Sequence, residues 1–155
     1  MDNQIIYFKK FNNLIAKLTQ TFSDLRPEEL RNLLFSLQEF NKNNNIPEDT
    51  SIYSTTFQAE SLEIISKEKI SKVLVGGIKK YINMKKPIPP VIIIKGNYRF
   101  LIVSGESYAI ESYLRKKPVK AIVFDINDRD IFETFKFDEN WVIFLVPIIK
   151  QHLEK

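Results

Sequence analysis

The stretch that decides the fold is residues 89–124, PPVIIIKGNYRFLIVSGESYAIESYLRKKPVKAIVF. No polar side chain interrupts its apolar run at 91–94, which is typical of a strand that is buried on both faces. Lys95, Gly96 and Asn97 are turn formers, so the apolar residues after them predict the returning strand of a hairpin. The stretch therefore predicts a strand, a turn, a second strand, a helix and a third strand, at residues 91–94, 95–97, 98–103, 108–115 and 119–124.

Two helices are predicted ahead of this stretch. Apolar residues recur at three- and four-residue steps between residues 8 and 22, and a second helix begins at Pro27 and runs to residue 41. The Asn-rich residues 41–49 have turn chemistry and no apolar period, so we expect a subdomain boundary there. The predicted domains are a helical hairpin at 1–45 and a second domain at 50–155.

Short strands are predicted at 52–57 and 62–65, followed by a helix at 67–84 that Ser66 caps. Gly76 and Gly77 weaken the interior of that helix. Either the helix bends at this pair or a neighbour packs closely against it, and close packing is the more common cause. The residues that we expect this helix to bury are Ile70, Val73, Leu74, Ile78 and Ile82.

Beyond residue 124, Asp128 is predicted to cap a short helix that ends at Phe135. The pattern at 141–155 fits either a strand or a helix. Strands that alternate with helices after a helical hairpin predict an α+β fold with a small mixed sheet.

The composition excludes several classes of protein. The 155 residues include no cysteine, which excludes disulfide scaffolds and thiol chemistry and leads us to expect a reducing, cytoplasmic location. The longest apolar run, 141–149, is too short to span a bilayer, and no leader pattern opens the chain, so we expect no membrane partner. No metal site is predicted, because His152 is the only histidine and the aspartates after residue 124 lack the rest of a calcium loop.

The positive charge is concentrated in the middle of the chain. Residues 67–120 have 13 basic and 3 acidic side chains, whereas 1–66 and 121–155 each have a net charge of −3. Clustered lysines attract a phosphate-rich partner, but a solvated helix face has the same pattern, and the sequence leaves both interpretations open. The lysines predicted to contact nucleic acid are Lys79, Lys80, Lys116 and Lys120. If these four converge on residues 104–108 together with Lys67, Lys69 and Lys117, binding is favoured, and if they point into solvent on different sides, it is not.

Residues 104–108, Ser-Gly-Glu-Ser-Tyr, lie between a predicted strand and a predicted helix. This order, with the Pro-flanked strand before it and Lys-Pro-Val after it, resembles the ParB/sulfiredoxin-like domain over about residues 60–126. Gly105 and Glu106 match the Gly-Glu of the ParB turn, whereas Ser107 and Tyr108 replace its two arginines. The resemblance implies a nucleotide, with Mg²⁺, whose phosphates lie at this turn. Sulfiredoxin activity is excluded, because it needs a cysteine and the chain has none.

A turn that opens a helix directs free backbone N–H groups outward and can hold a phosphate. If the turn is catalytic, Glu106 is the predicted base or metal-assisted phosphate partner in phosphoryl transfer or nucleotide hydrolysis. The alternative is a plain helix start that Ser104 caps. The residues predicted to bind phosphate or nucleotide are Gly105, Glu106, Ser107, Arg115 and Lys117.

Two functional hypotheses follow. The first is a ParB-like module associated with nucleotide or nucleic acid, of the kind found in plasmids, phages and other mobile elements. The second is a degenerate, noncatalytic domain in which the N-terminal helices dock another protein or a second copy. We do not expect sequence-specific DNA recognition, because about thirty residues follow Phe124 and a helix-turn-helix region would have to fit within them.

Overall fold

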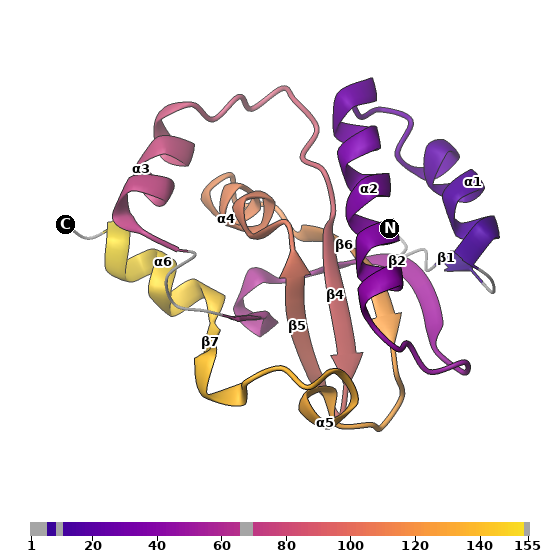
Figure 1. Cartoon of the computed structure of the whole chain (residues 1–155). Coiled ribbons are helices and arrows are strands. Elements are labelled where there is room, and N and C mark those ends of the chain that lie inside the picture. Colours follow the sequence, from indigo (N-terminus) through magenta and orange to yellow (C-terminus); the bar gives the residue numbers. More distant parts are fainter. Residues whose placement is uncertain (1–5, 9–10, 66–69, 154–155) are drawn as a thin grey trace.

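The computed structural model describes residues 6–8, 11–65 and 70–153. Over these residues, one sheet of seven strands runs in the order β1-β2-β6-β4-β5-β3-β7, with helices around it (Figure 1). The predicted α+β class is confirmed. The strands are β1 Ile6–Phe8, β2 Ser51–Phe57, β3 Glu63–Ile65, β4 Val91–Gly96, β5 Arg99–Ser104, β6 Val119–Asp125 and β7 Val142–Phe144. The helices are α1 Phe11–Thr21, α2 Pro27–Asn43, α3 Lys72–Lys80, α4 Glu106–Leu114, α5 Ile131–Phe135 and α6 Leu145–Leu153, with short 3-10 turns η1 Ala59–Ser61 and η2 Glu139–Trp141.

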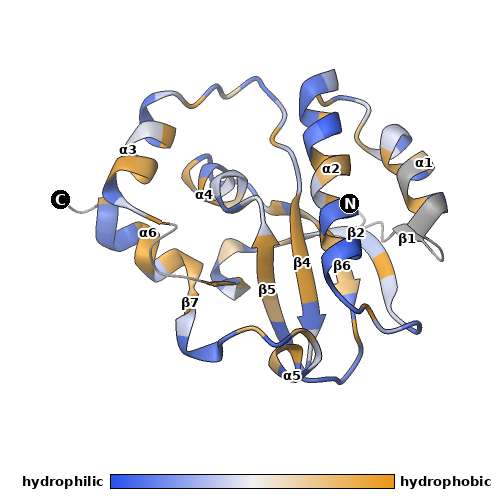
Figure 2. Cartoon of the chain, viewed as in Figure 1, coloured by the Kyte–Doolittle hydropathy of each residue, from blue (hydrophilic) through white to orange (hydrophobic). Residues whose placement is uncertain are grey.

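Strand β4 lies inside a mixed sheet, where it is parallel to β6 and antiparallel to β5. Its residues 91–94 are at most 1% exposed, which confirms the strand that the apolar run predicted. Ile92 and Ile94 belong to one apolar cluster, and Val91 and Ile93 belong to the other. The alternation follows from the two-residue period of a strand, and it places an apolar layer on each side of the sheet. Figure 2 shows β4 and β5 as hydrophobic over most of their length.

Helices α1, α2 and α5 share one apolar cluster with the sheet, and helices α3, α4 and α6 share the other. The two predicted N-terminal helices are confirmed, but they are not set apart from the sheet. Phe40 of α2 lies 4.9 Å from Phe124 of β6, measured between ring centroids. Residues on either side of the predicted boundary near residue 45 therefore belong to one core.

The hairpin between β4 and β5 turns through Asn97 and Tyr98, which both have positive φ angles, 48° and 62°. Gly96 was expected to be a turn residue, but it is the last residue of β4 and pairs with Arg99. A Cβ at Gly96 would lie 2.6 Å from the carbonyl oxygen of Arg129. The glycine is needed because the segment after β6 passes so close to it.

Helix α3 differs from its prediction in length and in packing. It begins at Lys72, and the Ser71 hydroxyl caps it by accepting a hydrogen bond from the Leu74 N–H at 3.1 Å. The predicted cap, Ser66, lies outside the described residues. Val73 was expected to be buried but is 85% exposed. The expected close packing at Gly76 and Gly77 is wrong, because a Cβ at either position would have no heavy atom within 4 Å.

Two expectations about the C-terminal part are also corrected. Asp130, and not Asp128, caps α5, because its carboxylate accepts from the N–H groups of Phe132 and Glu133. The region 141–155 was predicted as either a strand or a helix, and it contains both β7 and α6.

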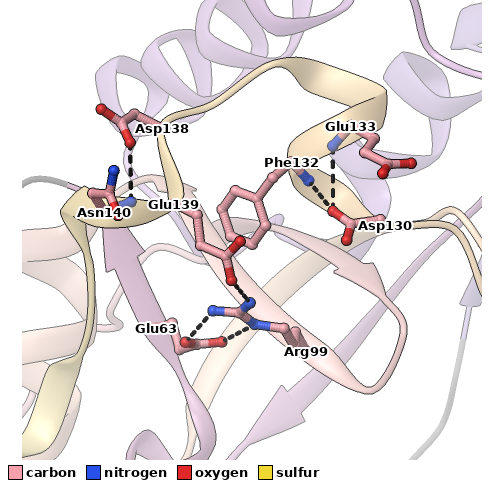
Figure 3. A network of polar contacts seen from close by, with 8 residues as sticks. All are labelled: Glu63, Arg99, Asp130, Phe132, Glu133, Asp138, Glu139 and Asn140. Carbon is pink, nitrogen blue, oxygen red and sulfur yellow. Dashed lines mark hydrogen bonds and ion pairs between the residues drawn. The ribbon is translucent and has the colours of Figure 1, made fainter.

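A cluster of charged side chains around Arg99 attaches η2 and α5 to the sheet (Figure 3). The guanidinium donates to both carboxylate oxygens of the buried Glu63, at 3.0 and 2.8 Å, and to Glu139 at 2.7 Å. It also lies 4.7 Å from the centre of the Phe132 ring. The hydrogen bonds to Glu63 raise the pKa of Arg99, so its charge is fixed at any working pH. We name these four residues, Glu63, Arg99, Phe132 and Glu139, the Arg99 clamp.

Candidate functional site

The turn at 104–108 forms a tight junction between β5 and α4. Gly105 is the residue before the helix and has φ +90°, a conformation that only glycine adopts without strain. A Cβ at this position would lie 3.2 Å from the Cα of Val91. Glycine is therefore required for packing against the protein's own strand β4. Ser104 was the expected cap in the plain helix-start interpretation, but Gly105 occupies the cap position.

The space beside this turn is small and has an acidic lining residue. Helix α2 covers it and leaves a crevice of about 50 Å³, which is much less than the roughly 300 Å³ at the lower end for small-molecule sites. Glu29 of α2 lines the crevice together with Gly105 and Tyr108. Burial raises the pKa of the Tyr108 phenol, and the nearby charges of Glu29 and Glu111 raise it further. A nucleotide phosphate at this turn would have to share a narrow space with a carboxylate.

Arg115 lies at the other end of α4 from Gly105, Glu106 and Ser107. The helix has nine residues, and at about 1.5 Å per residue its ends are about 13 Å apart. The Arg115 side chain is 1% exposed. It donates to the carbonyl oxygens of Met84 at 2.7 Å and Lys86 at 2.8 Å, and to Glu111 at 3.1 Å. The predicted phosphate ligands thus separate into two groups that cannot hold the same phosphate.

The chain leaves α4 through a turn that is rich in cations. The Lys117 N–H donates to the Ser112 carbonyl at 2.9 Å, and the Lys116 N–H donates to the Tyr113 carbonyl at 3.1 Å. This is the Schellman arrangement, in which the residue at the position of Lys116 is usually glycine. Lys116 has φ 57° there. Its positive charge suits the negative end of the helix dipole, but its backbone conformation is unfavourable for a residue with a side chain.

A cleft of about 520 Å³ opens beside this turn, and its size is within the range of small-molecule sites. We name it the Tyr113 cleft. Its surface combines a half-buried aromatic ring, aliphatic groups and the side chains of Lys116 and Lys117. The lining residues are Gln58, Ala59, Glu60, Tyr113, Leu114, Lys116, Lys117, Pro118 and Leu153. Glu60 is the single carboxylate among them.

A second, smaller hollow of about 70 Å³ adjoins the cleft and shares Lys117 and Pro118 with it. We name it the Arg115 crevice. Four of its lining residues are cationic, and among the described residues that line it none is acidic. The Nε atom of Arg115 is buried and has no hydrogen-bond partner. The crevice is lined by Lys86, Pro87, Ile88, Ser112, Arg115, Lys117, Pro118 and Lys120.

The predicted lysine cluster is only partly assembled. Lys116, Lys117 and Lys120 line the cleft or the crevice, at the opposite end of α4 from the turn at 104–108. Lys79 and Lys80 are exposed in the last turn of α3 and line neither hollow. Lys67 and Lys69 lie outside the described residues.

Sequence reasoning missed two residues of this site, Tyr113 and Lys86. Tyr113 lies two positions before the basic run at 115–117, and an aromatic residue beside clustered cations was a usable signal. Lys86 precedes Pro87 in a loop, and nothing in the sequence indicates that Arg115 binds this loop through its carbonyl groups.

The hypothesis of docking through the N-terminal helices requires an apolar outer face on α2. Leu30 and Leu34 pack against the core, and Leu33 and Leu37 are buried within it. Phe35, 63% exposed, is the one large apolar side chain of α2 that is exposed. One exposed ring is less apolar surface than the docking hypothesis predicted.

Comparison with known proteins adds no assignment to this geometry. Among the described residues, no three His, Asp or Glu side chains are grouped so that they could hold a metal ion. None of the described helices has the length and apolar character to cross a membrane. No family model, no curated protein and no solved structure matches the chain. The resemblance to ParB/sulfiredoxin-like domains therefore stays a prediction.

Proposed function

We propose that this chain binds a phosphate-bearing ligand, a nucleotide or a short segment of nucleic acid, in the Tyr113 cleft. One observation carries the proposal: a 520 Å³ cleft in which an aromatic ring lies together with Lys116 and Lys117. A base can stack on the Tyr113 ring, because every base has a π-face, and the two ammonium groups can neutralise a phosphate. The cleft has the apolar surface and the cations that such a ligand needs.

The element order at 91–125 supports a ParB-like fold as part of this proposal, because strand, hairpin, glycine turn, helix and strand follow in the expected sequence. Our proposal differs from the family resemblance in where the phosphate binds. It assigns phosphate to the C-terminal end of α4, since the crevice beside Gly105 is small and contains Glu29. It also includes a cytoplasmic location, which the absence of cysteine favours.

We propose binding and assign no catalytic residue in the cleft. Glu106 begins α4, so the length of the helix separates it from Lys116 and Lys117. If the bound nucleotide brings Mg²⁺, Glu60 is the carboxylate among the cleft residues that could contact the ion.

The test is thermal unfolding and calorimetric titration with single nucleotides and with single-stranded oligonucleotides, each with and without Mg²⁺. A ligand at about a hundred times its Kd adds roughly 2.7 kcal/mol of stability, which raises the Tm by several degrees. We expect Tyr113→Ala to remove this shift and Glu106→Ala to leave it unchanged. For an oligonucleotide, the logarithm of affinity should fall linearly with the logarithm of salt concentration.

Two outcomes would contradict the proposal. If no ligand in the panel stabilises the protein, the cleft does not bind phosphate compounds of this class. If Glu106→Ala removes binding while Tyr113→Ala retains it, the ligand lies at the 104–108 turn, as the family resemblance implies.

A further inference from the structure

The Arg115 crevice has more positive charge than its surroundings neutralise. Lys86 lies 3.4 Å from Glu29, and Arg115 lies 3.1 Å from Glu111, so each of these two cations has a carboxylate nearby. Within the part of the chain that the structure describes, Lys117 and Lys120 form no ion pair. Cations that converge on one hollow without neutralisation raise the local potential and favour an anion there.

The Arg115 side chain, which lines the hollow, also has a donor that lacks an acceptor. Two of the three guanidinium nitrogens of Arg115 are used, since one donates to Lys86 and Glu111 and the other donates to Met84. The Nε–H of the same group is buried and has no partner. Buried donors in folded proteins nearly always have an acceptor, which can be the protein, a water molecule or a ligand. Arg115 lines the crevice, so an oxyanion there would lie against the same guanidinium group.

The size of the hollow limits what can occupy it. A water molecule needs about 10–15 Å³, so 70 Å³ holds about five water-sized atoms. A phosphate group has five heavy atoms. Pro87 and Pro118 form part of the wall, and their rigid rings keep the space from widening easily. A base or a sugar does not fit inside the crevice, but each fits in the adjoining cleft.

We propose that the Arg115 crevice binds the terminal phosphate of the ligand, in the form of a phosphate monoester. This inference rests on the proposed function, because the remainder of the ligand lies in the Tyr113 cleft across the shared Lys117. A terminal phosphate has a charge near −2 and one ester substituent, which would pass the shared Lys117 and Pro118 to reach the cleft. An internal phosphodiester has a charge of −1 and two substituents, for which the small hollow has no room. The ligand class is therefore a nucleotide with a free phosphate end, and not the interior of a nucleic-acid strand.

The first experiment is isothermal titration at constant ionic strength with four probes: inorganic phosphate, adenosine, AMP and the 5′-methyl ester of AMP. We expect AMP to bind more tightly than phosphate or adenosine, and at least tenfold more tightly than its methyl ester. Lys120→Gln should weaken phosphate and AMP by about tenfold, which corresponds to one charge-assisted hydrogen bond. Lys42→Gln, which changes an exposed lysine of α2 outside both hollows, is the matched control and should have no effect.

The second experiment follows the Arg115 guanidinium itself. In ¹H–¹⁵N spectra of the wild type, inorganic phosphate should shift the Arg115 Nε–H resonance and slow its exchange with water. The same titration of Lys120→Gln should need about ten times more phosphate. Because this measurement needs only the folded protein and a small anion, it does not depend on the identity of the nucleoside.

The outcomes separate the two proposals. If phosphate binds, depends on Lys120 and shifts Arg115 Nε–H, but AMP binds no better than phosphate, the crevice site stands and the proposed function fails. If AMP binds through Tyr113 while Lys120→Gln and the Arg115 resonance show no effect, the proposed function stands and the crevice inference is overturned. If AMP and its methyl ester bind equally, the monoester assignment is overturned. Equal weak binding by the wild type and by both lysine variants would show nonspecific anion binding and would overturn the crevice site.

Discussion

Arg99 and Arg115 are two partly or fully buried arginines of the same chain, and each donates to three acceptor oxygen atoms. Arg99 donates to two carboxylates, Glu63 and Glu139, so its own charge is outnumbered by the acidic groups around it. Arg115 donates to two neutral carbonyl groups and to one carboxylate, Glu111. It is also more deeply buried, with 1% of its side chain exposed against 33% for Arg99.

The difference teaches that the type of acceptor decides what a buried arginine can do. The Arg99 clamp is neutralised internally and therefore serves to hold η2 and α5 against the sheet. Around Arg115 the carboxylates of Glu111 and Glu29 balance Arg115 and Lys86, whereas Lys117 and Lys120 add positive charge that no ion pair among the described residues neutralises. A cluster whose charges are neutralised stabilises the fold, whereas a cluster with unneutralised cations can bind a ligand.

The largest expected effect comes from Arg99→Met, which breaks the neutralised Arg99 clamp. The substitution leaves Glu63, 7% exposed, as a buried carboxylate without its counter-ion. We expect the free energy of unfolding to fall by about 3 kcal/mol. Urea denaturation measures this change, and calorimetric titration of the variant should show unchanged ligand binding.

A matched variant on the same clamp is Glu139→Gln, since 60% of the Glu139 side chain is exposed. The loss of an exposed ion pair costs at most about 1 kcal/mol, so this variant should be much milder than Arg99→Met. Similar losses from both variants would contradict the view that the buried Glu63 makes the clamp important.

The next largest effect is expected from a substitution of Arg115. Arg115→Lys retains the charge but replaces a planar fork with a single ammonium group, which cannot donate to Met84, Lys86 and Glu111 together. We expect a loss of about 2 kcal/mol in unfolding free energy, from two weakened hydrogen bonds to partly buried carbonyl groups. Unlike Arg99→Met, this variant should also weaken phosphate binding. If it binds phosphate like the wild type, the two arginines do not differ in the way we describe.

The sequence was sufficient to predict the central strand and the covering helix. It was not sufficient to predict which charged groups surround each arginine. The apolar run at 91–94 and the periodic residues of α2 predicted a central strand and a covering helix, because burial leaves a period in the sequence. The charge count along the chain also shows that residues 67–120 are basic. Charge along a chain does not show, however, which cations meet carboxylates in space. Arg99 and Arg115 belong to the same basic segment and have opposite surroundings.

The glycines show the same limit. Gly105 was interpreted as a place where a phosphate approaches the backbone, and it is the protein's own strand β4 that lies there. Gly76 and Gly77 were expected to indicate close packing, and the space beside them is open. A glycine in a sequence indicates missing side-chain volume or a positive φ, but the neighbour that requires it comes from elsewhere in the chain.

A smaller effect, of opposite sign for stability and for binding, is expected from Lys116→Gly. Lys116 has φ 57° at the end of α4, where glycine has no steric cost. The substitution should raise the free energy of unfolding by up to about 1 kcal/mol, measured by urea denaturation. It should also weaken a ligand in the Tyr113 cleft, because one of the two ammonium groups is removed. A variant that is more stable and binds equally well would show that Lys116 plays no part in the cleft.

The smallest expected effect comes from Glu29, which partly neutralises the Arg115 crevice through Lys86 at 3.4 Å. Burial alone would raise the pKa of Glu29, but hydrogen bonds from the Arg26 backbone N–H and the Arg26 and Lys86 side chains outweigh it, so the pKa lies below its usual 4.5. A lowered pKa means that the carboxylate stabilises the fold above pH 4.5 and that this contribution is lost as the pH falls through the folded-state value.

Glu29→Gln removes that contribution at neutral pH and leaves Lys86 without a counter-ion. We expect unfolding free energy at pH 7 to fall by less than about 1 kcal/mol, and the decline in stability below pH 4.5 to be shallower than in the wild type. Phosphate affinity at pH 7 should rise a few-fold, because the crevice becomes more positive and so differs further from the Arg99 clamp. Denaturation across a pH series and phosphate titration measure the two effects. A fall in phosphate affinity would mean that Glu29 positions Lys86 for the ligand and does not compete with the ligand for it.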